Sequence, residues 1–174
     1  VLHAIEAADG TGHLTDACLN GGIQMLNDDF RATGTQANTH SVDTGIQFAL
    51  ATTDPSGNPT TGIVRHVSTS WYDMTAQDEG EGFWTAAWDQ SRYLNVFIKS
   101  LRNHRPNYDP SLILMGYANF PYNTPSPTDG FVIYSRLWGP CSTTADDGAT
   151  ASHELGHYLG LKHTFTPNDG VSVN

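Results

Sequence analysis

The chain has 174 residues, enough for one domain with its own hydrophobic core, and its two cysteines exclude a small scaffold held together by many disulfides. Eighteen acidic residues against eight basic ones give a formal net charge of -10, which leaves no basic surface for nucleic acid. The apolar runs are all shorter than the roughly 18 residues of a membrane-spanning helix. We therefore expect neither nucleic acid nor a membrane among the partners of this chain.

The first predicted helix covers residues 15–31. Leu19, Ile23 and Leu26 recur at helical spacing, and Thr15 or Asp16 can cap the first turn. In residues 46–50, large apolar side chains then alternate with smaller or polar ones, and residues 54–59 are dense in turn formers. This pattern predicts a strand followed by a turn.

Further strands are predicted along the rest of the chain, separated by clusters of Gly, Pro, Asn and Asp. They cover residues 63–69, 94–98, 112–117 and 131–134. We find no internal repeat, so we expect one globular unit of the α/β (α+β) class, with a twisted mixed sheet and few helices.

Several smaller groups of residues could form sites, and each also has a structural explanation. The acidic residues of one loop could ligate calcium or simply be solvated, and three tryptophans could form a carbohydrate platform or supply core area. Five scattered histidines lack ligand spacing, so we expect surface or hydrogen-bonded core roles for them. These groups are Asp73, Asp78, Glu79 and Glu81; Trp71, Trp84 and Trp88; and His3, His13, His40, His66 and His104.

The two cysteines and the start of the chain bear on its cellular compartment. Cys18 and Cys141 are compatible with one disulfide in an oxidising compartment or with two buried thiols. The chain opens at Val1 with neither an initiator methionine nor a leader, so we expect a mature or excised product.

One motif has the spacing of a metal site: residues 149–165 read ATASHELGHYLGLKHTF. On a helix, His153 and His157 lie four residues apart on one face, and their rings can converge on one ion. In a continuous helix, His163 would lie about 9 Å beyond His157 along the axis and could not reach that ion. Gly160 allows the chain to turn back, because glycine adopts the left-handed conformation that ends a helix. Asp146 and Asp147 near the expected helix start complement the helix dipole.

This donor set predicts a catalytic zinc centre. Three neutral imidazoles favour Zn²⁺ over calcium or magnesium, although copper, cobalt or nickel would also bind. Three protein ligands leave a fourth position for water, and Glu154, next to the first ligand, can act as general base. These roles describe peptide-bond hydrolysis. A closed, noncatalytic zinc site is the alternative, but it leaves Glu154 and Gly160 unexplained.

At these residues the chain resembles the metzincin clan of zinc endopeptidases, whose signature is HExxHxxGxxH. Other segments resemble the pappalysin family in particular: LNDDFR at residues 26–31, YLNV at 93–96, GYANFP at 116–121 and HTF at 163–165. The resemblance implies that His153, His157 and His163 bind zinc and that Glu154 is the general base. It also implies an upper subdomain with a twisted mixed five-stranded sheet and two long helices, whose antiparallel edge strand binds an extended substrate. Residues 114–120 are our candidate for that edge.

The resemblance places the upper catalytic subdomain at residues 1–160 and the start of a truncated lower subdomain at residues 161–174. Metzincins continue into a methionine turn, which Met25, Met74 and Met115 cannot supply because they precede the signature. We thus expect a secreted zinc endopeptidase acting on proteins or peptides, whose cleft is completed by a separate C-terminal segment or chain. The alternative is a zinc-containing binding module that does not cleave. The family also suggests Ca²⁺, with Asp169 as a candidate ligand.

Overall fold

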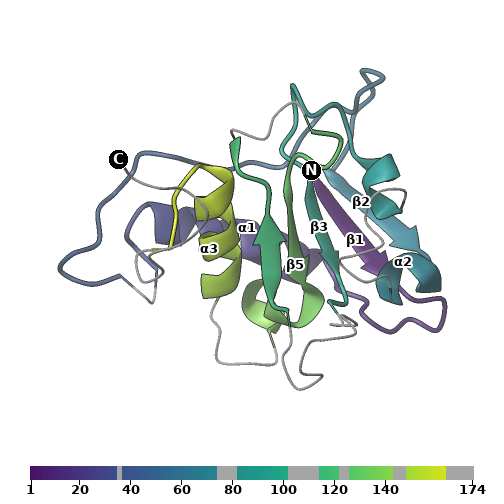
Figure 1. The fold of residues 1–174 in the computed structure, drawn as a ribbon, viewed down its shortest axis with the longest axis horizontal. Coiled ribbons are helices and arrows are strands. Elements are labelled where there is room, and N and C mark those ends of the chain that lie inside the picture. Colours follow the sequence, from purple (N-terminus) through teal and green to yellow (C-terminus); the bar gives the residue numbers. More distant parts are fainter. Residues whose placement is uncertain (35–36, 74–81, 102–113, 122–125, 143–147, 164–174) are drawn as a thin grey trace.

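A five-stranded sheet with helices on both faces forms the body of the molecule (Figure 1). The computed structural model describes residues 1–34, 37–73, 82–101, 114–121, 126–142 and 148–163. Its strands are β1 (Leu2–Glu6), β2 (Ile63–Val67), β3 (Val96–Lys99), β4 (Gly116–Ala118) and β5 (Phe131–Tyr134). They lie in the order β2-β1-β3-β5-β4, and every pairing is parallel except that of β4 with β5. The predicted mixed five-stranded sheet is therefore confirmed, with β4 as its antiparallel edge.

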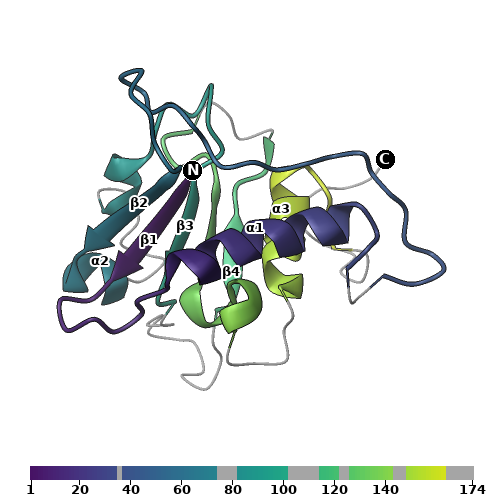
Figure 2. The same cartoon turned by 180° about the vertical axis from the view of Figure 1, so that it is seen from behind.

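Two longer helices cover one face of the sheet. Helix α1 (Asp16–Phe30) crosses the strands, in front of them in the view of Figure 2, and α3 (Ala149–Tyr158) lies beside it. The predicted cap of α1 is present, since the Cys18 N–H donates to Thr15 Oγ1 at 3.3 Å. The shorter α2 (Thr69–Asp73) and the 3₁₀ turn η1 (Phe83–Ala86) pack on the other face. None of the described helices is long and apolar enough to cross a membrane.

The core is divided by the sheet into two clusters because the central strands are buried on both faces. Val96 and Ile98 of β3 pack toward α1 and α3, whereas Phe97 packs with Phe83 and Trp84 on the opposite face. This alternation follows from the two-residue period of a strand, and burial on both sides explains the continuous apolar runs of β3 and β5. The sheet thereby provides a rigid support for α3.

The prediction of a strand at residues 46–50 is wrong. Within the described residues this segment belongs to no strand and lies along α1. Asn27 of α1 takes the place of a neighbouring strand: its Nδ2 donates to the Phe48 carbonyl at 2.9 Å, and its Oδ1 accepts from the Phe48 N–H at 2.7 Å. The Phe48 ring packs edge-on against Phe30, with centroids 5.1 Å apart. The turn that follows is present, with Asp54 Oδ1 accepting from the Asn58 N–H at 2.8 Å.

Strand β1 was not predicted, although it lies between β2 and β3 in the sheet. Its sequence, LHAIE, places a histidine and a glutamate among apolar residues, which hides the strand pattern. The other strands occur near their predicted positions. The predicted strand at 112–117 begins in residues outside the described part of the chain, and β4 covers Gly116–Ala118.

Candidate metal centre

Helix α3 carries the first two histidines of the motif on one side. His153 and His157 lie one turn apart, with ring centroids separated by 4.4 Å. The helix begins at Ala149 after Gly148. Asp146 and Asp147, which were expected to complement the helix dipole, lie outside the described residues.

A turn after α3 brings the third histidine back toward the helix. Gly160 has a φ of 97°, in the left-handed region that favours glycine. Its N–H donates to the His157 carbonyl at 2.9 Å, and the Leu161 N–H donates to the Gly156 carbonyl at 2.9 Å. This pair of bonds is the Schellman arrangement that ends a helix. The turn predicted at Gly160 is therefore present, and it redirects the chain toward His163.

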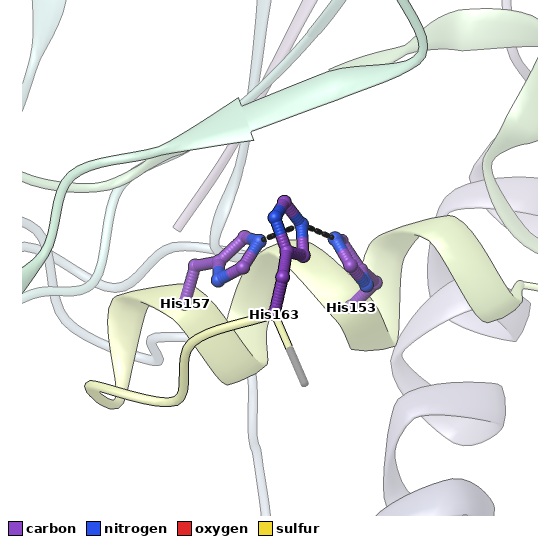
Figure 3. A group of neighbouring side chains, drawn as sticks. All are labelled: His153, His157 and His163. Carbon is purple, nitrogen blue, oxygen red and sulfur yellow. Dashed lines mark hydrogen bonds between the residues drawn. The ribbon is translucent and has the colours of Figure 1, made fainter. Parts of the chain in front are cut away.

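The three histidine rings converge on one point (Figure 3). Nε2 of His163 lies 3.0 Å from Nε2 of His153 and 2.9 Å from Nε2 of His157. Taken together, one ring nitrogen from each residue lies within 4.8 Å of the others. The spacing of the motif thus produces the juxtaposition that the sequence predicts.

This arrangement suits a metal ion. A neutral imidazole nitrogen carries either a proton or a lone pair, so the single Nε2 of His163 cannot donate to both neighbouring nitrogens. Nitrogens at 2.0–2.1 Å from a tetrahedral metal are roughly 3.3 Å apart, within a few tenths of an ångström of the two separations above. Imidazole donors are typical ligands of zinc, and the same set also admits copper, cobalt or nickel.

His157 is held in the orientation that a ligand requires. Its Nδ1–H donates to the Leu161 carbonyl at 2.7 Å, which leaves Nε2 with its lone pair toward the other histidines. The Phe120 ring packs against the His157 ring, with their centroids 5.2 Å apart. The turn after α3 therefore both returns His163 and fixes the tautomer of His157.

Glu154 lies beside the histidines and is largely withdrawn from solvent. Its side chain packs against Gly116 of β4, and only 6% of the residue surface is exposed. Burial raises the pKa of the Glu154 carboxyl to about 7. A buried carboxyl next to a cluster of imidazoles is an arrangement that recurs at catalytic sites.

A cavity of about 600 Å³ opens between α3 and the edge strand β4. It is lined by the three histidines, Glu154, and residues of β4 and its flanks, including Met115 and Tyr117. Tyr134 N–H donates to the Met115 carbonyl at 2.9 Å, and Asn119 N–H donates to the Gly130 carbonyl at 3.1 Å.

In an antiparallel ladder the residues that bond across alternate with residues that do not. Because Met115 bonds to Tyr134 of β5 and Asn119 bonds to Gly130 just before β5, the N–H and C=O groups of Gly116 and Ala118 point away from β5, toward the edge that no described strand covers. Our candidate for the edge strand, residues 114–120, therefore contains β4 and borders the cavity.

The remaining candidate residues lie away from this centre. His3 is fully buried and bonds to Asn95 and His66, whereas His13 bonds to Glu6, so both follow the predicted roles. Trp84 is in the core and Trp71 packs against it, which supports core packing over a carbohydrate platform. His40 is exposed, and His104 lies outside the described residues. The candidate calcium ligands Asp78, Glu79, Glu81 and Asp169 also lie outside them, so calcium binding stays a prediction.

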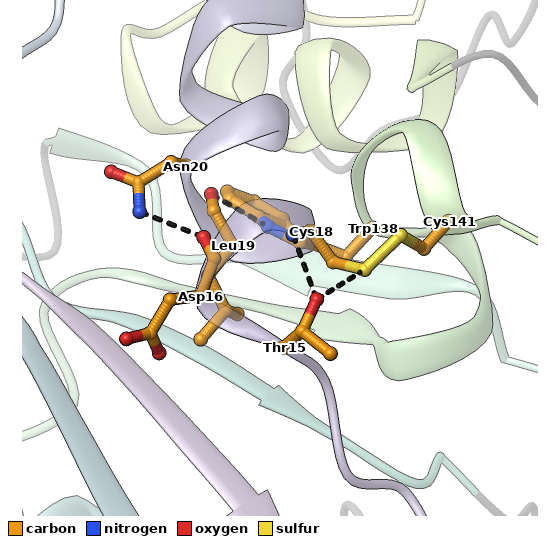
Figure 4. Close-up of a disulfide and its surroundings, with 7 residues drawn as sticks. All are labelled: Thr15, Asp16, Cys18, Leu19, Asn20, Trp138 and Cys141. Atoms are coloured by element: carbon orange, nitrogen blue, oxygen red, sulfur yellow. Dashed lines mark hydrogen bonds between the residues drawn. A yellow bond between two sulfur atoms is a disulfide. The ribbon is translucent and has the colours of Figure 1, made fainter.

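The two cysteines form a disulfide that ties α1 to the segment before α3 (Figure 4). Cys18 is in the first turns of α1, and Cys141 ends the 3₁₀ turn η4 (Gly139–Cys141), which follows η3 (Ser135–Leu137). Between them, Trp138 Nε1 donates to the Leu19 carbonyl at 3.2 Å. Of the two states compatible with the sequence, a disulfide or two buried thiols, the structure therefore has the disulfide.

One residue of the site was not singled out by sequence reasoning. Gly116 was quoted only as part of a family-like segment, yet its backbone contacts Glu154. A glycine inside a strand often marks the close approach of another group, and that is the signal which could have identified it.

Comparisons with known proteins show the family to which this chain is similar. Residues 78–171 match the family model described as Pregnancy-associated plasma protein-A, peptidase M43. The extracellular metalloproteases of Arthroderma gypseum and Pyricularia oryzae are 30% and 31% identical, over 92% and 93% of this chain and 46% and 48% of their own lengths. The chain thus spans about half the length of these relatives.

A solved structure of mature mirolysin from Tannerella forsythia, in complex with a cleaved peptide, is also similar. It superposes with a TM-score of 0.79 and 34% identity, covering 98% of this chain and 65% of that one. A second structure, mirolysin in complex with compound 9, gives a TM-score of 0.78 at the same identity, covering 97% of this chain and 64% of that one. The chain therefore belongs to the Pregnancy-associated plasma protein-A family of peptidases.

Proposed function

We propose that this chain carries the catalytic centre of a zinc endopeptidase. The observation that carries the proposal is the convergence of His153, His157 and His163 at the wall of a cavity that also contains Glu154. Relatives that align along nearly the whole chain are named metalloproteases, which supports the same activity.

The three histidines would hold the zinc ion through Nε2. Zinc bound by three protein ligands acts as a Lewis acid and lowers the pKa of water to near 7. The hydrogen bond from His157 Nδ1 to the Leu161 carbonyl keeps one ligand nitrogen aimed at the ion without further rearrangement.

Glu154 would act as the general base. Glu154 lines the cavity beside the histidines, where a carboxylate can take up a proton from water and release it again. It would accept a proton from the attacking water and then pass that proton to the nitrogen of the departing amine. Because Glu154 directly follows His153 on α3, its carboxylate would lie near the metal.

The substrate would be a protein or peptide that lies extended along β4. The edge-facing N–H and C=O groups of Gly116 and Ala118 can pair with the backbone of such a chain, as the edge of a sheet does when a strand is added. The similar mirolysin structure is a complex with a cleaved peptide, which supports this substrate class. A C-terminal segment or a separate chain would complete the opposite wall of the cleft.

We infer an extracellular location. Relatives are named extracellular metalloproteases, and the Cys18–Cys141 disulfide is typical of an oxidising compartment.

The test compares the Glu154→Gln variant with wild type, both loaded with zinc. We expect Glu154→Gln to keep its metal and to lose at least about a hundredfold in peptide cleavage, the usual scale for a general base. Glu6→Gln, an acid that pairs with His13 away from the site, is the matched control and should cleave normally. Unchanged cleavage by Glu154→Gln would overturn the assigned role, and zinc-loaded wild type without cleavage would favour a binding module.

A further inference from the structure

Gly116 of β4 lies directly against the side chain of Glu154. A Cβ atom built on Gly116 would be 2.6 Å from Glu154 Cγ and 3.0 Å from both Cδ and Oε1. These are its three nearest neighbours, so the missing side chain of Gly116 is replaced by the carboxylate arm of Glu154.

The backbone does not require glycine at this position. The φ angle of Gly116 does not lie in the left-handed region, and Gly116 pairs regularly with Ile133 in the antiparallel ladder. An alanine could adopt this strand conformation without strain. The reason for glycine is therefore the close contact with Glu154.

The helix that carries Glu154 is fixed from its other sides. Ala151 and Leu155 are buried in the core beneath the sheet, and Ser152 Oγ donates to Asp29 of α1 at 2.5 Å. Because α3 cannot withdraw easily, a methyl group at Gly116 would displace the flexible end of Glu154 instead. That displacement changes the position of the carboxylate relative to the histidines.

We propose that Gly116 is a positioning residue: its missing side chain sets how closely the Glu154 carboxylate approaches a peptide bound along β4. The inference rests on the proposed function of Glu154 as general base. Gly116 also presents its N–H and C=O toward the open edge, and both groups remain in an alanine variant. The substitution therefore moves the base while it preserves the backbone groups that would bind substrate.

The experiment measures zinc content, kcat and KM for the Gly116→Ala variant on a peptide substrate. Misplacement of a catalytic group by about 1 Å costs on the order of a hundredfold in rate, so we expect kcat to fall by about 10- to 100-fold. Zinc content should stay the same, and KM should change by less than about threefold, because the peptide-binding groups of β4 are retained. Unchanged kcat in Gly116→Ala, when Glu154→Gln is inactive, would overturn this inference alone. Activity in Glu154→Gln would overturn the proposed function.

A double-mutant cycle separates positioning from damage to the strand. In the Glu154→Gln background, Gly116→Ala should reduce the residual rate by less than about twofold, because the group on which it acts has already been removed. An equal loss in both backgrounds would show that Gly116 acts through β4 and would contradict the proposal.

If Gly116→Ala is too unstable for kinetic measurements, the midpoint of thermal unfolding is compared with and without this substitution, in wild type and in Glu154→Ala. In the Glu154→Ala background the new methyl group enters vacated space, so Gly116→Ala should leave the midpoint of thermal unfolding unchanged there. A loss of the same size in both backgrounds would refute the contact.

Discussion

The stability of the fold should depend on pH through a histidine that takes no part in the metal centre. His3 of β1 is fully buried, and burial lowers its pKa to about 3 from an ordinary value of 6.5. Asn95 fixes its tautomer, because Asn95 Nδ2 donates to the carbonyl groups of Trp88 and Tyr93. Asn95 Oδ1 must then accept from His3 Nε2, at 3.0 Å. His3 Nδ1 is left to accept from His66 Nε2, at 3.1 Å, and a proton there would oppose that bond.

The expected magnitude follows from proton linkage. The unfolded chain protonates His3 near pH 6.5, whereas the folded chain does so only near pH 3. Between these values the unfolded state binds more protons, so the free energy of unfolding falls as the pH falls, approaching about 1.4 kcal/mol per pH unit. From pH 6.5 to pH 4.5 the contribution of His3 to the free energy of unfolding should fall by about 2 kcal/mol.

Urea unfolding of the metal-free protein between pH 7 and pH 4.5 tests this expectation. A chelator is present throughout, so that zinc release at low pH does not affect the measured stability. The matched control is the variant His3→Gln, whose amide can donate to Asn95 and accept from His66 but cannot titrate. The difference in stability between wild type and His3→Gln should change by about 2 kcal/mol over this range. Parallel pH profiles for the two proteins would refute the reasoning.

Two further predictions concern the elements that surround α1. The paired variant Cys18→Ser/Cys141→Ser should lose about 4 kcal/mol of unfolding free energy in urea, because the disulfide spans 123 residues of sequence; a loss below about 1 kcal/mol would contradict this. Asn27→Ala should lose about 1–2 kcal/mol and speed amide exchange at Phe48, because it removes both hydrogen bonds that hold that segment; unchanged exchange at Phe48 would count against it.

The centre was predictable from sequence because its geometry is local. His153 and His157 are one helical turn apart, and a single glycine decides whether His163 can return, so spacing alone indicates which side chains meet. Glu154 was predicted in the same way, as the neighbour of the first ligand. Its contact with Gly116 was not, because residues 38 positions apart meet only through the packing of α3 on β4.

The errors in the predicted fold also arise from contacts between residues far apart in the sequence. Residues 46–50 have the alternation of a strand, but Asn27 supplies the hydrogen bonds that a neighbouring strand would have supplied. Strand β1 contains His3, a polar residue that the sheet tolerates because Asn95 and His66 satisfy it. The sequence could not decide between a disulfide and two thiols, because two cysteines 123 residues apart become partners only through the tertiary fold.

Zinc-edge X-ray absorption of the zinc-loaded protein reports the ligands of the metal directly. We expect three imidazole nitrogens and one light oxygen donor at about 2.0–2.1 Å, and two imidazoles in the variant His163→Ala. A fourth side-chain ligand in the wild type, or an unchanged spectrum in His163→Ala, would contradict this expectation.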